Sequence, residues 1–247
     1  MKIAGRSDIG LIRAKNQDNY LISENKDGDY IAIVCDGIGG AKAGEVASLM
    51  AIKVVGNSFV DTKNFDSIKK VEDWFKKSLN KANDSIFSKT IENSEYAGMG
   101  TTFVAAVFLK DQMLIANVGD SRAYVLEKNQ LKQVTKDHSL VNELLESNQI
   151  TKDEVASHPQ RNVLTNALGV VGDLRIDFYE LSLDKKLLLC SDGLSGYVLE
   201  NKLYDVLSND NLSIDLMLEK LIDLANSVGG YDNITAVIAD MGGVKDE

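Results

Sequence analysis

The sequence predicts an α+β fold, in which a central sandwich of two mainly antiparallel β-sheets is flanked by helix pairs on both outer faces. Three observations support this prediction. The β-prone runs follow one another at short spacing, helical patterns occur in separate groups, and no linker or repeat divides the chain. A chain of 247 residues with 44% hydrophobic content can bury one large core, so we expect a single domain over residues 1–247.

The first half of the chain is expected to form strands and two long helices. Strands are predicted at 1–7 and within 19–36, where residues 26–29 (Lys-Asp-Gly-Asp) favour a hairpin turn. Apolar residues at the 3.6-residue period predict helices at 44–59 and 66–91. A polar loop separates the second helix from a meander of four strands, at 101–109, 112–118, 122–127 and 131–135.

The second half begins with a segment of a different kind. Residues 139–162 combine short helical patterns with polar breaks and the single proline, Pro159, so we expect a flap-like insertion there. The core then resumes with strands at 174–181 and 186–191, a helix at 212–228 and a last strand at 233–239.

The charge balance argues against one class of partner. There are 27 Lys and Arg residues against 37 Asp and Glu, a net charge of −10, and no basic run offsets it, so we expect no nucleic-acid partner. Residues 1–6 contain no signal-peptide core, and no apolar run approaches the ~18–20 residues of a membrane span. We therefore expect no membrane association.

The two cysteines, Cys35 and Cys190, each end an apolar run just before an aspartate. They form neither a CxxC pair nor a disulfide framework, which is typical of a reducing cytoplasm. A cysteine-nucleophile phosphatase needs an arginine a few residues after the thiol to hold phosphate, and neither cysteine has one. Both are therefore interpreted as small buried hydrophobic residues.

Four aspartates lie where predicted strands meet turns: Asp36, Asp120, Asp192 and Asp232. Carboxylates at the ends of several core strands can converge once the sheets pack together. Converging carboxylates repel one another unless a cation neutralises them, and all-oxygen ligands suit Mg²⁺ or Mn²⁺. The pattern predicts a two-metal hydrolase site.

These aspartates belong to a series of short motifs in one order along the chain. The series comprises Arg13-Ala14-Lys15-Asn16-Gln17-Asp18, Asp36-Gly37-Ile38-Gly39-Gly40, Gly100-Thr101-Thr102, Ala116-Asn117-Val118-Gly119-Asp120-Ser121-Arg122, Thr135-Lys136-Asp137-His138-Ser139, Leu164-Thr165-Asn166-Ala167-Leu168-Gly169, Ser191-Asp192-Gly193 and Asp232-Asn233-Ile234-Thr235. In this order they resemble the metal-dependent serine/threonine protein phosphatases of type 2C, the PPM family, in their compact bacterial form. The resemblance runs from about Ser7 to Ala239.

The resemblance implies a set of metal ligands. Asp36 and the carbonyl of Gly37 would hold a first ion, and Asp36, Asp192 and Asp232 a second. Asp120, with Asp192, matches the pair that binds a third, weaker ion in bacterial members. The expected cofactor is Mn²⁺ or Mg²⁺, with two ions in the site and room for a third that binds more weakly.

The resemblance also implies a reaction. Two ions about 3.5–4 Å apart can share a water, lower its pKa and direct it at phosphorus without a phospho-enzyme. Arg13 would hold the phosphate with its planar guanidinium, and Asp18 would accept hydrogen bonds from waters around the metals. The expected activity is hydrolysis of phosphoserine and phosphothreonine in proteins.

Other residues in the motifs are expected to be supports. Arg122 is expected to pair with a neighbouring carboxylate, and His138 to be hydrogen-bonded rather than to bind metal. Thr101 and Thr102 are expected to be structural, and His158 to lie at the surface.

Three positions depart from the family pattern. Ile38 stands where eukaryotic members often carry a histidine proposed to protonate the leaving alcohol. A general acid would then be a metal-bound water or another group, and good leaving groups should suffer least. Gln17 replaces a glutamate, which removes one charge. Asn166 replaces an arginine of many bacterial members, so contact with the phosphopeptide should be weaker.

The expected partners are phosphorylated proteins, namely the substrates of a cognate Ser/Thr kinase and the kinase itself, and the expected state is a cytoplasmic monomer. Two alternatives remain at this point. One is a metal phosphohydrolase that also takes phosphotyrosine or small phosphoesters. The other is a silent regulator that binds phosphoproteins without turnover; such proteins usually lose a metal aspartate, and this chain keeps all of its own.

Overall fold

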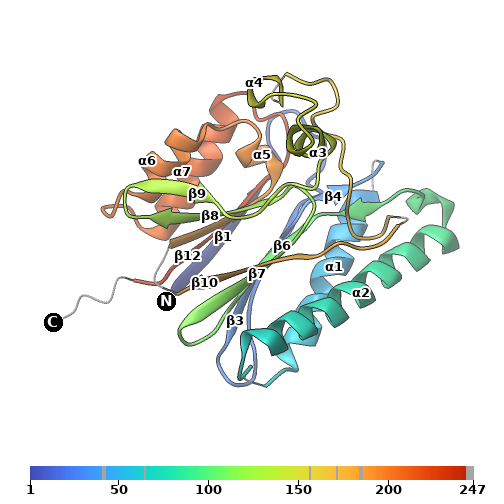
Figure 1. Cartoon of the computed structure of the whole chain (residues 1–247), viewed down its shortest axis with the longest axis horizontal. Helices are drawn as coiled ribbons and strands as arrows, with labels where there is room; N and C mark the ends of the chain where they lie inside the picture. Colours follow the sequence, from blue (N-terminus) through green and yellow to red (C-terminus); the bar gives the residue numbers. More distant parts are fainter. Residues whose placement is uncertain (41–42, 64, 156, 171, 184–185, 243–247) are drawn as a thin grey trace.

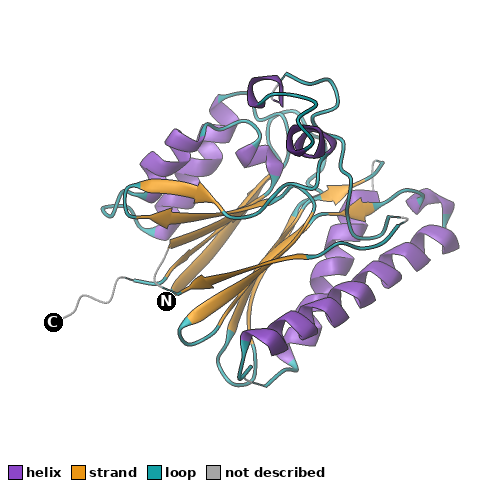
Figure 2. Cartoon of the chain, viewed as in Figure 1, coloured by secondary structure: helices purple, strands orange, loops and turns teal. Residues whose placement is uncertain are grey.

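The computed structural model describes residues 1–40, 43–63, 65–155, 157–170, 172–183 and 186–242. Two five-stranded sheets face each other, and helices cover the outer side of each (Figures 1 and 2). Every neighbouring pair of strands is antiparallel. The α+β sandwich with outer helix pairs that the sequence predicts is confirmed.

The first sheet has the strand order β1-β12-β11-β8-β9 and the second the order β10-β7-β6-β3-β2. The strands of the first sheet are β1 (Lys2–Asp8), β12 (Ile234–Asp240), β11 (Lys186–Cys190), β8 (Arg122–Glu127) and β9 (Gln130–Gln133). Those of the second are β10 (Asp177–Ser182), β7 (Gln112–Val118), β6 (Phe103–Phe108), β3 (Tyr30–Cys35) and β2 (Asn19–Glu24). A small third sheet pairs β4 (Gly37–Ile38) with β5 (Gly100–Thr101).

Two helices lie on each outer face. Helices α1 (Ala43–Val60) and α2 (Ile68–Glu92) cover the second sheet, and α6 (Glu200–Leu207) and α7 (Ile214–Ser227) cover the first. The short helices are α3 (Leu140–Glu146), α4 (Lys152–Val155), α5 (Asp192–Ser195) and a 3₁₀ turn at Ser94–Tyr96. Figure 1 shows α3, α4, α5 and β4 at one end of the sandwich.

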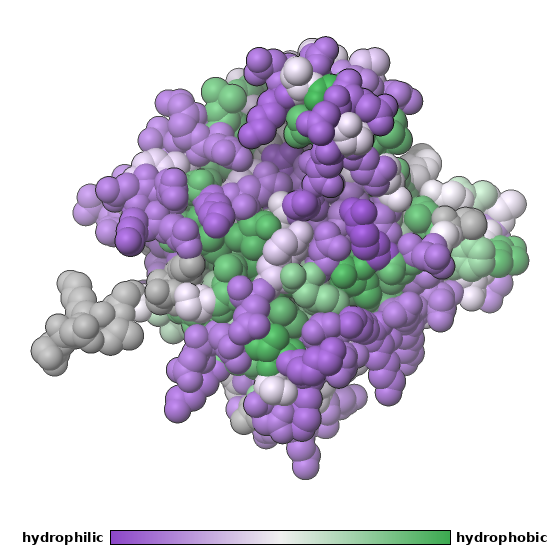
Figure 3. Space-filling view, viewed as in Figure 1, coloured by the Kyte–Doolittle hydropathy of each residue, from purple (hydrophilic) through white to green (hydrophobic). Residues whose placement is uncertain are grey.

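The core has three apolar layers because successive strand residues point to opposite faces. In β3, Ile31, Ile33 and Cys35 face α1 and α2, whereas Ala32 and Val34 face the other sheet. A third layer joins the first sheet to α6 and α7. In Figure 3 hydrophobic residues gather along the middle of the molecule, with polar regions above and below.

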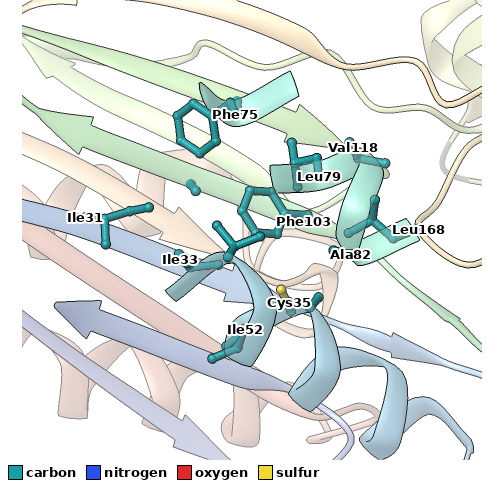
Figure 4. Close-up of a cluster of buried hydrophobic side chains, with 14 of the residues drawn as sticks. Ile31, Ile33, Cys35, Ile52, Phe75, Leu79, Ala82, Phe103, Val118 and Leu168 are labelled. Atoms are coloured by element: carbon teal, nitrogen blue, oxygen red, sulfur yellow. The ribbon is translucent and has the colours of Figure 1, made fainter. Parts of the chain in front are cut away.

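Both cysteines are buried, as expected from the sequence. Figure 4 shows the sulfur of Cys35 among hydrophobic side chains that include Ile33 and Phe103. Burial raises the pKa of the Cys35 thiol well above its usual range and that of Cys190 to about 12. Neither thiol is therefore a nucleophile in the folded chain.

Helix α1 bears on the expectation that the chain contains no run long enough to span a membrane. By length and composition alone it could cross a membrane, contrary to the expectation that no apolar run is long enough. Half of this span is buried inside the domain, where α1 packs on α2 and on the second sheet. This is the environment of a core helix.

Some local features differ from the sequence predictions. Helices α5 and α6 lie in stretches for which no helix was predicted, and the β4–β5 pair was not predicted either. Strand β10 begins at Asp177 rather than at residue 174. Helices α3 and α4 fall within the predicted insertion at 139–162, in which residue 156 lies outside the described residues.

Candidate active site

Five aspartates gather at the end of the sandwich that carries α5. Asp18 precedes β2, Asp36 follows β3, Asp120 lies in the β7–β8 turn, Asp192 begins α5 after β11, and Asp232 precedes β12. Burial raises the pKa of Asp36 well above its usual range, and the charges of the other four raise it further. The strand ends therefore bring together the carboxylates that the sequence singled out.

Asp18 is the most deeply buried of these carboxylates. Its Oδ2 accepts a hydrogen bond of 2.7 Å from the hydroxyl of Ser191, which in turn accepts one of 3.0 Å from the backbone N–H of Thr235. Burial, and to a smaller extent the charges of Asp192 and Asp232, raise the pKa of Asp18 to about 7. Ser191 thus joins β11, β12 and Asp18 at one point.

Two threonines hold the backbone of Asp36. Its N–H donates to Oγ1 of Thr102 at 2.9 Å, and its carbonyl accepts from Oγ1 of Thr101 at 2.8 Å and from the backbone N–H of Thr102 at 2.9 Å. Thr102 also bonds the Ser121 hydroxyl at 2.7 Å, next to Asp120. The expected structural role of Thr101 and Thr102 is confirmed.

Gly37 follows Asp36 in a tightly packed position. A Cβ at Gly37 would lie 2.1 Å from the carbonyl oxygen of Gly44 and 2.7 Å from that of Gln17, so any larger residue would displace backbone. Close packing between β4 and the start of α1 is therefore the reason that glycine is needed here.

Two of the remaining carboxylates, Asp120 and Asp192, face a cavity of about 400 Å³ that is lined in part by residues from the 139–162 segment. Burial, followed by the charges of Asp192 and Asp137, raises the pKa of Asp120 well above its usual range. Burial and the charge of Asp232 raise the pKa of Asp192, against a contact with Asp36 that lowers it. The cavity therefore opens onto carboxylates whose negative charge is unfavourable unless a positive charge compensates it.

The donor chemistry of this region fits hard divalent cations. Oδ1 of Asp18 and Oδ1 of Asp192 are buried and have no hydrogen-bond partner, which is costly for a carboxylate unless a cation or water satisfies it. Among the described residues, no three Asp, Glu, His or Cys side chains form a complete metal-binding group as they stand. The aspartates are assembled, but their side chains do not form a closed cage.

Arg13 lies at the edge of this cluster. Its guanidinium forms a 2.6 Å ion pair with Oδ2 of Asp232, and its side chain is 52% exposed. The loop that carries Arg13 is held by Asn233, whose amide donates to the carbonyls of Ile9 and Lys15 at 2.9 Å and accepts from the N–H of Gln17 at 2.8 Å. Asn233 therefore fixes the position of Arg13 relative to Asp232.

The sequence and the fold match one family. A family model described as protein phosphatase 2C matches residues 13–236. The chain is 42% identical to the serine/threonine phosphatase stp of Listeria welshimeri, over 95% of this chain and 94% of that protein. It is 36% identical to the protein phosphatase PhpP of Streptococcus pneumoniae, over 98% of each.

Solved structures agree. The serine/threonine phosphatase Stp1 from Staphylococcus aureus has a TM-score of 0.93 and 36% identity, over 98% of this chain and 95% of that chain. The Mycobacterium tuberculosis phosphatase PstP/Ppp has a TM-score of 0.85 and 33% identity, over 97% of each. The chain belongs to the protein phosphatase 2C family. It is therefore a hydrolase, a serine/threonine protein phosphatase of the bacterial type, and the family implies metal dependence.

Arg122 of the phosphatase has the structural role that the sequence favours. Its Nε and Nη2 bind both carboxylate oxygens of Asp137 at 2.6–3.0 Å, and Nη1 donates to the Tyr124 hydroxyl at 3.0 Å. The charge of Arg122 also lowers the pKa of Asp120, against the effect of burial. Arg122 thus stabilises the wall of the cavity.

His138 of the phosphatase is a buried, hydrogen-bonded support, as expected. Its Nδ1 accepts from the N–H of Gly119 at 3.2 Å and from the amide of Asn166 at 2.7 Å, which assigns the proton to Nε2, 3.1 Å from Asp177. Burial lowers the pKa of His138. Asn166 also forms hydrogen bonds with the backbone of Arg175, so its amide is fully used in holding His138 in place.

Sequence reasoning gave no role to Ser191 or Asn233, although both lie within the motifs. Each side chain makes its bonds to residues that are more than 40 positions away, for example Ser191 to Asp18 and Asn233 to Gln17. Their position directly beside Asp192 and Asp232 is the one signal in the sequence that could have identified them.

Proposed function

We propose that this phosphatase hydrolyses phosphoserine and phosphothreonine in proteins at a two-cation aspartate site that takes Mn²⁺ or Mg²⁺. The observation that carries the proposal is the gathering of five aspartates from separate strand ends, with two buried carboxylate oxygens that have no partner. Such a group can keep its full negative charge at neutral pH only if cations offset it.

Each ligand in this proposal comes from a strand end. Asp36 and the carbonyl of Gly37 would hold one cation, and Asp36, Asp192 and Asp232 the other. Asp120, with Asp192, would hold a third beside the cavity. Supporting this assignment, the pKa values of Asp36, Asp120 and Asp192 are raised by burial and by the charges of neighbouring carboxylates, a penalty that bound cations would remove.

When bound, the cations would supply an activated water nucleophile and neutralise the phosphate. The protein's own residues do the rest. Arg13 would exchange its pairing with Asp232 for two phosphate oxygens. Breaking the ion pair costs little free energy, because a half-exposed ion pair contributes about 0–1 kcal/mol. Asp18 would accept hydrogen bonds from water at its unpartnered Oδ1.

Proton delivery to the leaving alcohol would not come from residue 38. Ile38 has no proton to donate, so water would protonate the leaving oxygen. Substrates with good leaving groups should therefore lose the least from this substitution.

The physiological partners follow from the activity. We propose that the substrates are targets of a cognate Ser/Thr kinase, with the kinase itself among them, and that the phosphatase acts in the cytoplasm as a monomer. The chain has 37 acidic and 27 basic residues, and this negative balance supports the view that nucleic acid is not a partner.

The test compares the parent protein with Asp36→Asn and Asp192→Asn on peptides that carry phosphothreonine, phosphoserine or phosphotyrosine, with Mn²⁺ present. The proposal predicts turnover of the first two peptides and a loss of at least about 100-fold in both variants. Equal turnover by the variants would contradict the metal assignment, and preferred turnover of phosphotyrosine would contradict the substrate class.

A further inference from the structure

The loop that carries Arg13 also exposes two large apolar side chains. Leu11 is 67% exposed and Ile12 is 66% exposed, and they immediately precede Arg13. Tyr231, at 52% exposure, immediately precedes Asp232, the partner of Arg13. We call these three residues, Leu11, Ile12 and Tyr231, the apolar rim.

The backbone holds the apolar rim in place. The N–H groups of Leu11 and Ile12 donate to the carbonyl of Gly230 at 2.8 and 3.2 Å. Gly10 packs so closely that a Cβ there would lie 2.2 Å from the carbonyl oxygen of Asp232. The segment that carries Leu11 and Ile12 is therefore anchored to the segment that carries Tyr231. The side chains of Leu11 and Ile12 are exposed although their backbone is held in place.

The rim is continuous with the cavity of the active site. The rings of Tyr231 and Tyr197 lie 5.4 Å apart, and Tyr197 lines the cavity beside Asp192. Burial, and then the charges of Asp192 and Asp232, raise the pKa of Tyr197, while Arg161 and then Arg13 oppose them. An aromatic pair thus connects the exposed apolar surface to the charged centre.

The two sides of the active site differ in chemistry. Toward the flap, the cavity is lined by charged residues that include Arg122, Lys136, Asp137 and Arg161. On the side of the loop that carries Arg13, the rim offers two aliphatic side chains and an aromatic ring. A ligand that spans the centre therefore meets polar surface on one side and apolar surface on the other.

We propose that the apolar rim binds an apolar side chain that flanks the phosphorylated residue of the substrate. This rests on the proposed function, in which Arg13 holds the phosphate. An extended peptide advances about 3.3–3.6 Å per residue, so a neighbour one to three positions away reaches the residues adjoining Arg13. The rim therefore selects phosphopeptides with Leu, Ile, Val or Phe beside the phosphoresidue.

The chemistry of the rim favours this occupant. Leu11 and Ile12 can offer only apolar contact, and burial of such side chains releases free energy in proportion to area. The net charge of −10 also disfavours peptides with acidic flanks. A segment that is apolar next to its phosphate satisfies both conditions.

The experiment uses phosphothreonine peptides that place Leu or Ser at positions −2, −1, +1 and +2. For the parent protein, we expect kcat/KM to favour Leu over Ser by about ten-fold at one or two of these positions, which matches the transfer of one aliphatic group. The Leu11→Ser/Ile12→Ser double variant should reduce this ratio to about one. Ile91→Ser, an equally exposed residue at the end of α2, should keep the parental ratio.

Failure of the rim and failure of the proposed chemistry can be told apart. If the parent protein hydrolyses neither p-nitrophenyl phosphate nor the peptides, the proposed chemistry is wrong. Binding at the rim is then measured by fluorescence anisotropy of the same peptides with the parent and the double variant. Equal affinity or turnover for Leu and Ser peptides would overturn the rim proposal. It would also be overturned if the double variant kept the preference and only abolished self-association in sedimentation, since a second copy would then be the occupant.

Discussion

Arg13 and Asp232, 219 positions apart in the sequence, form a 2.6 Å ion pair at the mouth of the carboxylate cluster. The hydrogen bond to Asp232 raises the pKa of Arg13, so the guanidinium is charged throughout the physiological range. Arg13 thus pairs with a carboxylate that we propose as a metal ligand, and it would compete there with a cation.

Arg13→Ala is expected to separate phosphate binding from cation binding. Loss of charge-assisted bonds to phosphate should lower kcat/KM by about 10- to 100-fold. The same change should tighten Mn²⁺ binding a few-fold in calorimetry, because Asp232 loses its competitor. Arg6→Ala, at an exposed position of β1, is the control and should leave both unchanged. Weaker Mn²⁺ binding by Arg13→Ala would contradict this account.

Asn233→Ala is expected to loosen the Arg13 loop. The change removes three hydrogen bonds to backbone groups of Ile9, Lys15 and Gln17. We predict a loss of about 2 kcal/mol or more in the free energy of unfolding in urea, with a lower kcat/KM. Asn57→Ala, at an exposed position on α1, should change stability by less than about 0.5 kcal/mol. Equal stability of the two variants would show that Asn233 is not a structural hub.

The stability of the protein in EDTA should depend on pH through Asp18. The pKa of Asp18 is raised from 3.8 to about 7 in the folded state, so the folded protein binds more protons than the unfolded chain between these values. Stability should therefore fall as the pH rises from about 4 to about 7.

Asp18→Asn keeps the shape of the side chain and removes the charge, so it should reduce this fall by on the order of 3 kcal/mol at most. The raised pKa values of Asp36, Asp120 and Asp192 should leave a residual fall in the variant. Urea unfolding midpoints of parent and variant across this pH range measure the effect. Parallel curves for the two proteins would mean that Asp18 is not the group responsible.

The cysteines should be inert in the folded protein. Cys35 and Cys190 are fully buried and the pKa of each thiol is raised. Iodoacetamide should leave the mass and the activity of the native phosphatase unchanged, and should add two adducts after unfolding in urea. Rapid inactivation of the native protein by alkylation would indicate a reactive thiol.

The long elements were predictable because their hydrophobic period is sustained. Helices α1 and α2 and the meander strands follow from apolar spacing alone. Helix α6 has only eight residues, and β4 and β5 have two each, so no period can develop in them. Leu174 and Ile176 lie before β10 and pack on the helix layer without pairing in the sheet, which is why that strand was predicted to begin too early.

The aspartates of the candidate site could be predicted because each follows or precedes a strand within a family motif. The supports could not, since they depend on contacts between distant segments. The sequence offers no sign that Ser191 bonds Asp18, or that Asn166 turns its amide to His138 rather than toward substrate.

The most direct test of the central claim is hydrolysis of a phosphothreonine peptide by the purified protein in EDTA, in Mg²⁺ and in Mn²⁺, measured side by side. The two-cation account predicts no turnover in EDTA and turnover with either added ion. Turnover that persists in EDTA, or its absence from folded protein with both ions, would contradict it.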